Sequence, residues 1–252
     1  MNALITGASS GLGKDFAHIA AKRGYNLILV ARRKELLLEI KKDIEQQYEV
    51  SVAIVVADLT KPGVIETLVK KHNDIKMLIN NAGFGLTGPF EELSSEKQAN
   101  MIHLNCTILM ELSHAYIPIL IKNKGYILNV ASIAGFIPGP YMATYFATKA
   151  YVVSLSNSLH KEYKGKIGIT CLCPGPTETE FQKVAGATFK GVPSYPVAKK
   201  GFDAMLKKKR MCIPGLGNKM SVLASTILPT GIALDIISNM NKPKILKEKQ
   251  KR

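Results

Sequence analysis

A tyrosine and a lysine four residues apart form a pair that could do acid–base chemistry. Tyr145 and Lys149 lie in the stretch GPYMATYFATKAY, and residues at that spacing are neighbours on a helix face, about 5 to 6 Å apart between Cβ atoms. A free phenol titrates near pH ~10, and a nearby cation lowers that pKa. The pair could therefore act as a general acid or base. The alternative is a Tyr and a Lys that only share a solvated helix surface. Tyr141 and Tyr151 have no cation at that spacing.

A glycine-rich turn follows the first apolar run of the chain. TGASSGLG places glycines at positions 7, 11 and 13, between an expected strand and an expected helix. Glycine lets the backbone turn sharply and approach a ligand closely, and the free N–H groups of a helix start favour a pyrophosphate. Because this turn opens the first strand–helix unit, it is predicted to bind a dinucleotide.

The end of the second expected strand indicates which dinucleotide. A carboxylate at this place accepts hydrogen bonds from the ribose of NAD and would repel the 2′-phosphate of NADP. This chain has Ala31 followed by Arg32 and Arg33, and a guanidinium can bind phosphate bidentately. The sequence therefore predicts NADP(H) in preference to NAD(H).

Apolar runs alternate with helical patterns from the first residues onward. Strands are expected near residues 3–5, 26–31, 51–57, 76–80, 125–132 and 167–173, and helices near residues 16–24, 34–48, 62–72, 94–121 and 143–163. This alternation predicts a doubly wound, Rossmann-like α/β fold, a parallel sheet with helices on both faces. Ligands of such sheets lie beyond the carboxyl ends of the strands. The turns that carry the motifs above lie at those ends.

The totals fit one globular domain, predicted over residues 1–241. The chain has 252 residues, of which 46% are hydrophobic, an ordinary composition for a single α/β domain. No signal peptide is expected at MNALITG. The apolar region VLASTILPTGIALDII is interrupted by Pro229, Gly231 and Asp235 and falls short of the ~20 residues that a membrane span needs. We expect a cytoplasmic protein with no transmembrane segment, reduced thiols at Cys171 and Cys173, and no metal site.

The net charge of +15 is concentrated in two short segments. Residues 199–210 and residues 242–252 each carry six cations and one acid. The basic C-terminal tail at 242–252 has no aromatic side chain on which a base could stack, so we expect a solvated end and no nucleic-acid site. A basic surface can still attract an anionic cofactor.

These separated motifs, in this order, resemble those of the short-chain dehydrogenase/reductase family in its single-domain form. The resemblance covers almost the whole chain. The family's adenine-contacting acidic position matches Asp58, and its Asn-Asn-Ala-Gly signature matches residues 80–83. Its catalytic Asn, Ser, Tyr and Lys match Asn105, Ser132, Tyr145 and Lys149. The resemblance implies cofactor contacts from Gly7, Ser9, Ser10, Gly11, Leu12, Gly13, Arg32, Arg33, Asp58, Leu59, Asn81, Ala82, Gly83, Tyr145, Lys149, Pro174, Gly175, Thr177 and Thr179.

The resemblance also implies a role for each catalytic residue. Tyr145 is expected to donate a proton to a substrate carbonyl as hydride arrives from the nicotinamide, and to take it back in the oxidative direction. Lys149 is expected to lower the phenol pKa and to hold the nicotinamide ribose. Ser132 would hydrogen-bond the carbonyl oxygen, and Asn105 would anchor a water that links Lys149 to solvent.

The substrate is expected to be a small carbonyl compound or alcohol, under a lid at about residues 180–200. That segment mixes Phe181, Phe189, Val192 and Tyr195 with small residues, which indicates a mobile cover over a fairly apolar pocket. An aliphatic or alicyclic ketone or aldehyde is the leading class, followed by a hydroxysteroid and then by a 3-oxoacyl thioester. The segment LPTGIALDIISNMNK could close the pocket, pack on another subunit or touch a membrane. A homodimer or homotetramer is expected from the resemblance alone.

Two other kinds of function stay open from the sequence. One is a binding module that senses NADPH without turnover, although such a module does not need all four catalytic residues. The other is nucleic-acid binding through the basic C-terminal third, which predicts retention on heparin that residues 242–252 would account for.

Overall fold

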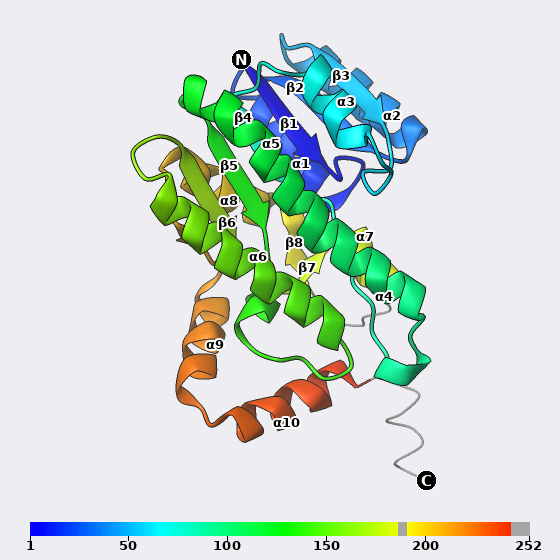
Figure 1. Ribbon diagram of the computed structural model, residues 1–252, viewed down its shortest axis with the longest axis vertical. Helices are drawn as coiled ribbons and strands as arrows, with labels where there is room; N and C mark the ends of the chain where they lie inside the picture. Colours follow the sequence, from blue (N-terminus) through cyan, green and yellow to red (C-terminus); the bar gives the residue numbers. More distant parts are fainter. Residues whose placement is uncertain (186–190, 243–252) are drawn as a thin grey trace.

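Strands and helices alternate along the chain in the computed structural model, which describes residues 1–185 and 191–242 (Figure 1). In chain order the elements are β1 (Asn2–Thr6), α1 (Gly11–Ala21), β2 (Asn26–Ala31), α2 (Lys34–Gln47), β3 (Val52–Val56), α3 (Val64–Lys71), β4 (Met77–Asn80), the 3₁₀ turn η1 (Phe90–Glu92), α4 (Ser95–Ile102), the π-helix η2 (His103–Ile108), α5 (Leu109–Lys122), β5 (Tyr126–Val130), the 3₁₀ turn η3 (Ile133–Phe136), α6 (Ala143–Glu162), β6 (Gly168–Leu172), β7 (Thr177–Glu178), α7 (Glu180–Ala185), β8 (Val192–Pro193), α8 (Ser194–Leu206), β9 (Met211–Cys212), α9 (Leu216–Ile227) and α10 (Thr230–Asn241).

The main sheet of the described residues is parallel throughout. Its strand order is β3-β2-β1-β4-β5-β6-β9, and β7 and β8 form a separate short pair. The chain runs outward from β1 in one direction and then, from β4, in the other, so the turns after β1 and β4 lie side by side. Such a reversal point is where doubly wound sheets bind ligands. The predicted fold class is confirmed.

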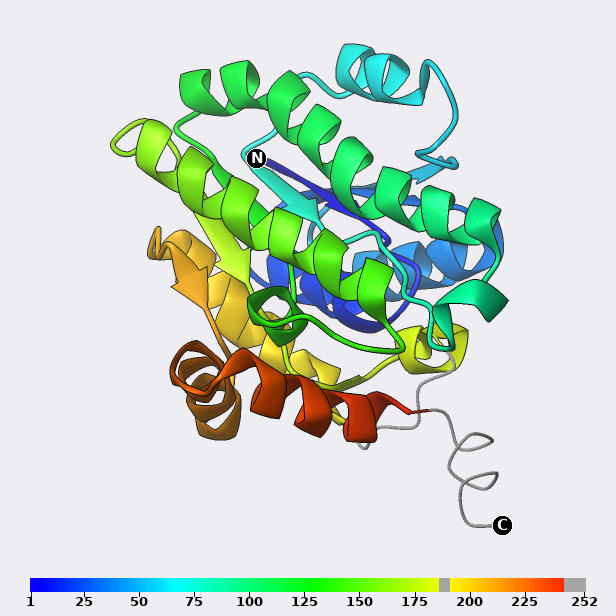
Figure 2. The same ribbon diagram turned by 60° about the horizontal axis from the view of Figure 1, so that its bottom comes forward.

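Helices cover both faces of this sheet, which Figure 2 shows as two layers. One face packs on α1, α2 and α8, where Phe16, Leu37 and Phe202 are fully buried. The other packs on α3, α5 and α6, where Tyr116 and Leu120 are fully buried. Since both faces are covered, the strands need apolar residues on both sides, and this explains their continuous Val, Ile and Leu runs.

The helix that the sequence places near 94–121 contains a π-helical turn. Ser94 caps its start by accepting a hydrogen bond from the Lys97 N–H (3.3 Å), and η2 then interrupts the α-helix before α5 continues it. Among the described residues, this Ser95–Lys122 helix alone is long and apolar enough to cross a membrane, and half of its most apolar window is buried inside the fold. The sequence predicts no such segment; the helix meets the criterion because α5 presents an apolar side to the sheet.

The expected lid at residues 180–200 divides into parts with different surroundings. Residues 180–185 form α7, and Phe189 lies outside the described residues. Residues from 194 onward form α8, in which Val197, Ala198 and Phe202 are buried against the sheet. Arg23, two residues after α1, stacks on the Phe202 ring at 5.0 Å and pairs with Asp203. Residues from 194 onward therefore pack one side of α8 against the sheet, whereas the sequence assigned residues up to about 200 to the lid.

The four cysteines are free thiols in the structure. Cys106, Cys171 and Cys173 are buried, and the sulfur atoms of Cys171 and Cys173 lie 3.6 Å apart without a covalent bond. Cys171 and Cys173 belong to one apolar cluster between β6 and α6. The reduced pair predicted from the sequence is thus a packing feature.

Replacement of Phe202 by alanine tests whether α8 belongs to the core. The side chain is fully buried, so Phe202→Ala should lower the free energy of unfolding by about 3 to 5 kcal/mol in urea denaturation. Leu38→Ala on α2, whose side chain is 45% exposed, should change it by no more than about 0.5 kcal/mol. Equal, small effects of both substitutions would restore the lid interpretation of residues 194–200.

Candidate active site

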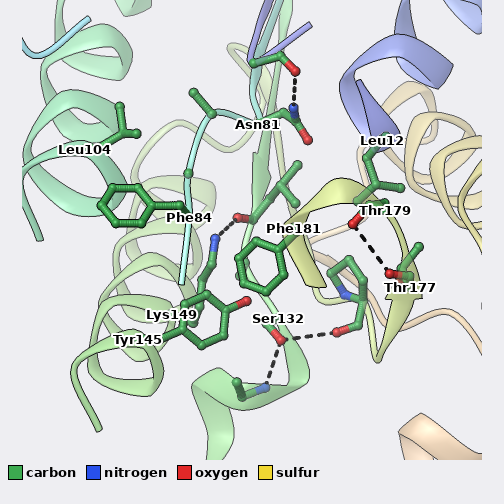
Figure 3. Close-up of a pocket in the computed structure, with 18 of the residues that line it drawn as sticks. Leu12, Asn81, Phe84, Leu104, Ser132, Tyr145, Lys149, Thr177, Thr179 and Phe181 are labelled. Carbon is green, nitrogen blue, oxygen red and sulfur yellow. Dashed lines mark hydrogen bonds between the residues drawn. The ribbon is translucent and has the colours of Figure 1, made fainter. Parts of the chain in front are cut away.

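A pocket with a volume of about 880 Å³ opens at the carboxyl ends of β1, β2, β3, β4, β5 and β6. Arg32, Arg33 and Asp58 line one end, and Tyr145, Ser132 and Lys149 line the other. Figure 3 shows the second end, with the Tyr145, Lys149 and Ser132 side chains converging from α6 and the end of β5. The pocket therefore joins two groups of residues that the sequence singles out separately.

Almost all the predicted site residues line this pocket. They are Gly7, Ser9, Ser10, Gly11, Leu12, Arg32, Arg33, Asp58, Leu59, Asn81, Ala82, Gly83, Ser132, Tyr145, Lys149, Pro174, Gly175, Thr177 and Thr179. The two exceptions are Gly13 and Asn105, which lie beneath the surface. Both residues support the site from beneath its surface.

The glycine turn after β1 is held against the turn after β4. Gly7 has φ +63°, the left-handed region that favours glycine, and the Asn81 side chain donates to the carbonyl oxygens of Thr6 (3.0 Å) and Gly7 (3.2 Å). A Cβ at position 13 would come within 2.2 Å of the Gly7 carbonyl oxygen. Gly13 thus lets α1 start directly against the turn, which leaves its N-terminal N–H groups facing the pocket.

Arg33 organises the end of the pocket beside β2. Its guanidinium donates to the hydroxyl oxygens of Ser9 (3.0 Å) and Ser10 (2.9 Å) and pairs with the Glu180 carboxylate of α7 at 2.7 Å. A phosphate group placed here would meet a cation that is already oriented beside the glycine turn. Sequence reasoning found Arg33 but missed Glu180, because nothing in the spacing connects α7 with β2.

Asp58 lies at the same end, at the carboxyl end of β3. The Thr60 hydroxyl (2.7 Å) and the Thr60 N–H (3.0 Å) both donate to one of its carboxylate oxygens. These hydrogen bonds, aided by the nearby Arg32, hold the pKa of Asp58 below its usual range. The carboxylate is therefore ionised and fixed at neutral pH, and it can accept hydrogen bonds from a ligand.

Tyr145 and Lys149 are buried at the other end of the pocket, only 8% and 7% exposed. The Lys149 ammonium donates to the carbonyl oxygen of Val130, the last residue of β5, at 2.8 Å and lies 5.8 Å from the centre of the Tyr145 ring. Ser132, two residues after β5, accepts a hydrogen bond from the Ala134 N–H (3.1 Å). Its hydroxyl is also a hydrogen-bond partner of the Tyr145 phenol. The predicted catalytic pair is thus assembled, with Ser132 beside it.

Burial shifts the pKa values of both residues. Burial raises the pKa of Tyr145 to about 12, although the hydrogen bond with Ser132 opposes this shift. Burial lowers the pKa of Lys149 to about 8. The expectation that Lys149 lowers the phenol pKa is therefore not met, since loss of solvation outweighs a cation that lies 5.8 Å from the ring centre and is turned to Val130. At neutral pH the phenol is protonated and can donate.

Asn105 does not reach the pocket surface. It lies in the π-helix η2, 1% exposed. Its amide oxygen accepts from the Phe84 N–H (3.1 Å), and its amide nitrogen donates to the Phe84 carbonyl oxygen (2.9 Å) and to the Thr148 hydroxyl (3.1 Å). These contacts fix the chain after β4 against α6, the helix that carries Tyr145 and Lys149. Asn105 is a positioning residue in this structure, whereas the sequence reasoning gave it a water-binding role.

Aromatic and apolar side chains surround Tyr145. Phe181 of α7 packs on the Tyr145 ring with centroids 5.2 Å apart, and Phe84, Met142 and Ile237 belong to the same cluster. Ile237 comes from α10, so the C-terminal helices help to form the pocket wall. The sequence analysis named Phe181 as part of the expected lid, and it missed Phe84, Met142 and Ile237, whose places in the pocket depend on contacts between distant segments.

Comparisons with known proteins agree with this geometry. A family model described as short chain dehydrogenase matches residues 1–190. An NADP-dependent 3-hydroxy acid dehydrogenase from Schizosaccharomyces pombe is 44% identical over 72% of this chain and 73% of its own. A very-long-chain 3-oxoacyl-CoA reductase from Anas platyrhynchos is 31% identical over 99% of this chain and 83% of its own. A solved short-chain dehydrogenase from Sphingobium yanoikuyae in complex with NADPH superposes with a TM-score of 0.82, at 31% identity over 90% of this chain and 93% of that one.

The buried ammonium of Lys149 predicts a pH-dependent stability. Its folded pKa of about 8 lies below its ordinary value of 10.5. Between these values only the unfolded chain holds the proton, so the stability that Lys149 contributes rises with pH and is lost as pH falls through about 8. Lys149→Met removes this dependence. From about pH 7 to about pH 10, the free energy of unfolding of the variant should therefore fall by about 2 kcal/mol relative to the wild type in urea denaturation.

An exposed lysine on the same helix is the control for this measurement. Lys161 is solvent-exposed near the end of α6, so Lys161→Met should follow the wild type at both pH values. Parallel stability curves for Lys149→Met and the wild type would show that the ammonium is not desolvated as the structure indicates.

Proposed function

The chain belongs to the short-chain dehydrogenase family and is an oxidoreductase of hydroxyl and keto groups, and from this premise we propose an NADP(H)-dependent carbonyl reductase and alcohol dehydrogenase. The observation that carries the proposal is the convergence of the Tyr145 phenol, the Ser132 hydroxyl and the Lys149 ammonium at one end of a pocket whose other end holds Arg33. A proton donor (Tyr145), a group that can bind the carbonyl oxygen (Ser132) and a cation that can bind phosphate (Arg33) therefore line the same pocket.

The residues of the pocket have the chemistry that a dinucleotide needs. Gly13 removes the side chain that would fill the space between α1 and the glycine turn, and the free N–H groups at the start of α1 face the place of a pyrophosphate. Asp58 supplies a fixed acceptor and Arg33 a fixed cation at the other side. When bound, the nicotinamide supplies or accepts the hydride.

Tyr145 moves the proton of the reaction. Its phenol, protonated at neutral pH, donates to the carbonyl oxygen as the carbonyl carbon gains hydride, and in the reverse direction its oxygen takes the proton back from the alcohol. Ser132 donates a hydrogen bond to the same oxygen and stabilises the negative charge that develops there. The ammonium of Lys149, 5.8 Å from the centre of the Tyr145 ring, favours the phenolate left after proton transfer, although burial outweighs this effect.

Arg33 supports the choice of NADP(H). Among the pocket residues at the β2 end, Arg33 is held by two serine hydroxyls that belong to the glycine turn, and no carboxylate occupies the position directly after β2, where NAD-binding sites have one. The fission-yeast relative is named as NADP-dependent and the Sphingobium structure contains NADPH, which points the same way.

An apolar carbonyl compound is the substrate class that this pocket favours. Phe84, Met142, Phe181 and Ile237 surround Tyr145, and an apolar substituent would gain free energy by leaving water against them. The leading class is an aliphatic or alicyclic ketone or aldehyde. The second candidate is a 3-oxoacyl thioester or a 3-hydroxy acid, because the names of two relatives give those substrates.

Replacement of Tyr145 by phenylalanine tests the proton transfer. Tyr145→Phe should lower kcat by about 10² to 10⁴-fold, the usual contribution of a positioned acid or base, and leave NADPH affinity close to the wild type. Tyr141→Phe is the matched control, since Tyr141 belongs to the same sequence stretch and does not line the pocket; it should keep wild-type turnover. Turnover of Tyr145→Phe above about a tenth of the wild-type value would overturn the assignment.

Replacement of Arg33 by alanine tests the cofactor choice. Charged hydrogen bonds contribute about 1.5 to 3 kcal/mol each, so the Kd of NADPH for Arg33→Ala should rise about 10- to 100-fold. The Kd of NADH should change by less than about threefold, because NADH carries no 2′-phosphate. Fluorescence titration of both cofactors measures the two values on the same protein. An equal loss for both cofactors would show that Arg33 supports the turn without reading the phosphate.

A substrate panel then separates the two candidate classes. Wild-type protein with NADPH should reduce ketones and aldehydes with apolar substituents more efficiently, by kcat/KM, than acetoacetyl or longer 3-oxoacyl thioesters. The opposite order would establish the second candidate and leave the oxidoreductase assignment intact.

A further inference from the structure

Exposed cations gather at the edge of the sheet where the strands begin. Turns lead into β5, β6 and β9, which are neighbours in the sheet. Glu162 is the acid within these turns and the helix ends before them. Nine solvent-exposed cations lie in the same stretches, and we call them the basic edge: Lys122, Lys124, Lys161, Lys164, Lys166, Lys207, Lys208, Lys209 and Arg210.

Contacts between the turns bring these cations onto one surface. The Gly168 N–H donates to the Gly125 carbonyl oxygen at 3.0 Å, which joins the turns before β5 and β6. The Lys208 side chain lies against Gly168, and its ammonium is 6.0 Å from the centre of the Tyr126 ring. The turn before β9 therefore contacts both of the others. Figure 2 shows the end of α6 and the chain that leads into β9 on the same side of the molecule.

The fold does not neutralise the charges of the basic edge. No ion pair within the described residues includes any of its nine cations. Arg210 donates to the Asn157 amide oxygen at 2.8 Å, which leaves its charge in place. The partial charge at a helix C-terminus is about half an elementary charge, so one cation after each of α5, α6 and α8 would offset it. The remaining positive charge faces solvent.

Two lysines of the basic edge occupy backbone positions that favour glycine. Lys124 (φ 49°) follows α5 and Lys208 (φ 51°) follows α8, both in the left-handed region. The turn after α6 has Gly165 in that region (φ 87°). Glycine is the usual residue where a helix ends in this way. The two lysines thus add charge at places where glycine would end the helix with less strain.

The basic edge lacks the features of a protein–protein interface. The centre of such an interface is normally apolar and rich in aromatic residues. Of the large apolar side chains that are exposed in the described residues, none lies in the turns before β5, β6 and β9. A protein partner would therefore find charge and no apolar contact.

The basic edge also lacks the features that read nucleic acid. Tyr126 and Tyr163 are half-buried, and the Lys208 ammonium lies over the Tyr126 ring, so neither ring is open for a base to stack on. Helices contact duplex phosphates through their N-termini and enter the major groove lengthwise. Here α5, α6 and α8 present their C-terminal ends.

We propose that the basic edge is a peripheral docking surface for membranes that contain anionic lipid. Charge alone draws a polybasic surface to negative headgroups, and this requires neither apolar insertion nor base contacts. The basic edge lies where the strands begin, whereas the pocket opens where they end. Docking therefore leaves the pocket open to water. The proposal does not depend on the reaction or on its substrate.

Vesicle sedimentation with the full chain tests the proposal without an enzymatic readout. Wild-type protein should pellet with phosphatidylcholine vesicles that contain about 30% phosphatidylglycerol, and the binding should weaken as KCl rises from about 0.1 M to about 0.5 M. Binding to pure phosphatidylcholine should be at least about 10-fold weaker. Protein that stays in the supernatant with anionic vesicles at about 0.1 M KCl would overturn the proposal.

One charge reversal in each turn tests where the lipid binds. Lys124→Glu, Lys166→Glu and Lys209→Glu together should weaken binding to anionic vesicles by at least about 10-fold. The fold should persist because all these side chains are exposed, and thermal unfolding checks this. Wild-type binding by a folded triple variant would contradict the proposal.

A matched control changes the net charge equally at other places. Lys34→Glu and Lys42→Glu on α2 with Lys219→Glu on α9 also reverse three exposed cations. This variant should bind within about threefold of the wild type, because screening limits charge effects to about 10 Å at 0.1 M salt. If it loses as much binding as the first triple variant, net charge explains the attraction and the basic edge is not the site.

Replacement of Lys124 by glycine removes one charge without adding strain. Glycine suits φ 49°, so Lys124→Gly should unfold at the wild-type temperature or above it. Its binding to anionic vesicles should still fall about fivefold. Unchanged lipid binding by this stable variant would exclude Lys124 from the docking surface and contradict the proposal.

Two further outcomes would assign the binding elsewhere. Residues 242–252 also carry six cations, so Lys247→Glu, Lys249→Glu and Lys251→Glu together should cost less binding than the triple variant of the basic edge. A loss that is at least as large would move the site to the chain end. Tighter binding to a DNA duplex of about 20 base pairs than to anionic vesicles, at equal phosphate concentration, would assign the basic edge to nucleic acid.

Discussion

The site depends on an ammonium group that the fold keeps out of water. Lys149 lies on a helix between an apolar cluster and the end of β5, and the Val130 carbonyl oxygen is the acceptor that the structure supplies for it. Removing a charge from water costs free energy, which is why its pKa falls toward neutrality. The apolar packing on both faces of the sheet offsets this cost. The buried charge therefore lowers the stability of the folded chain at neutral pH.

The start of α7 connects the two ends of the pocket. Phe181 covers one side of the Tyr145 ring, and the adjacent Glu180 pairs with Arg33 at the opposite end of the pocket. Two neighbouring residues at the start of α7 therefore touch both ends of the site. The position of α7 is tied at once to the aromatic wall and to the cation beside the glycine turn, so the two ends of the pocket are not independent.

The sequence predicted the features that follow from local patterns. Continuous Val, Ile and Leu runs indicated buried parallel strands, and the glycines at 7, 11 and 13 marked the turn that the structure places at the reversal point of the sheet. The spacing of Tyr145 and Lys149 indicated a shared helix face. What the sequence could not show are contacts between distant segments, such as Arg33 with Glu180, and net effects of burial, such as the raised pKa of Tyr145. β9 was missed because two residues carry no periodicity.

The π-helix η2 makes the length of its segment as important as its composition. A π-turn holds one residue more than an α-turn, and here that residue lets the Asn105 amide reach Phe84 while Met101 stays buried and Gln98 accepts a hydrogen bond from Thr144. Loss of one residue between positions 103 and 108 would rotate α4 by about 100° relative to α5. Homologous chains that keep this site should therefore align through the segment without a gap, even where the residues themselves differ.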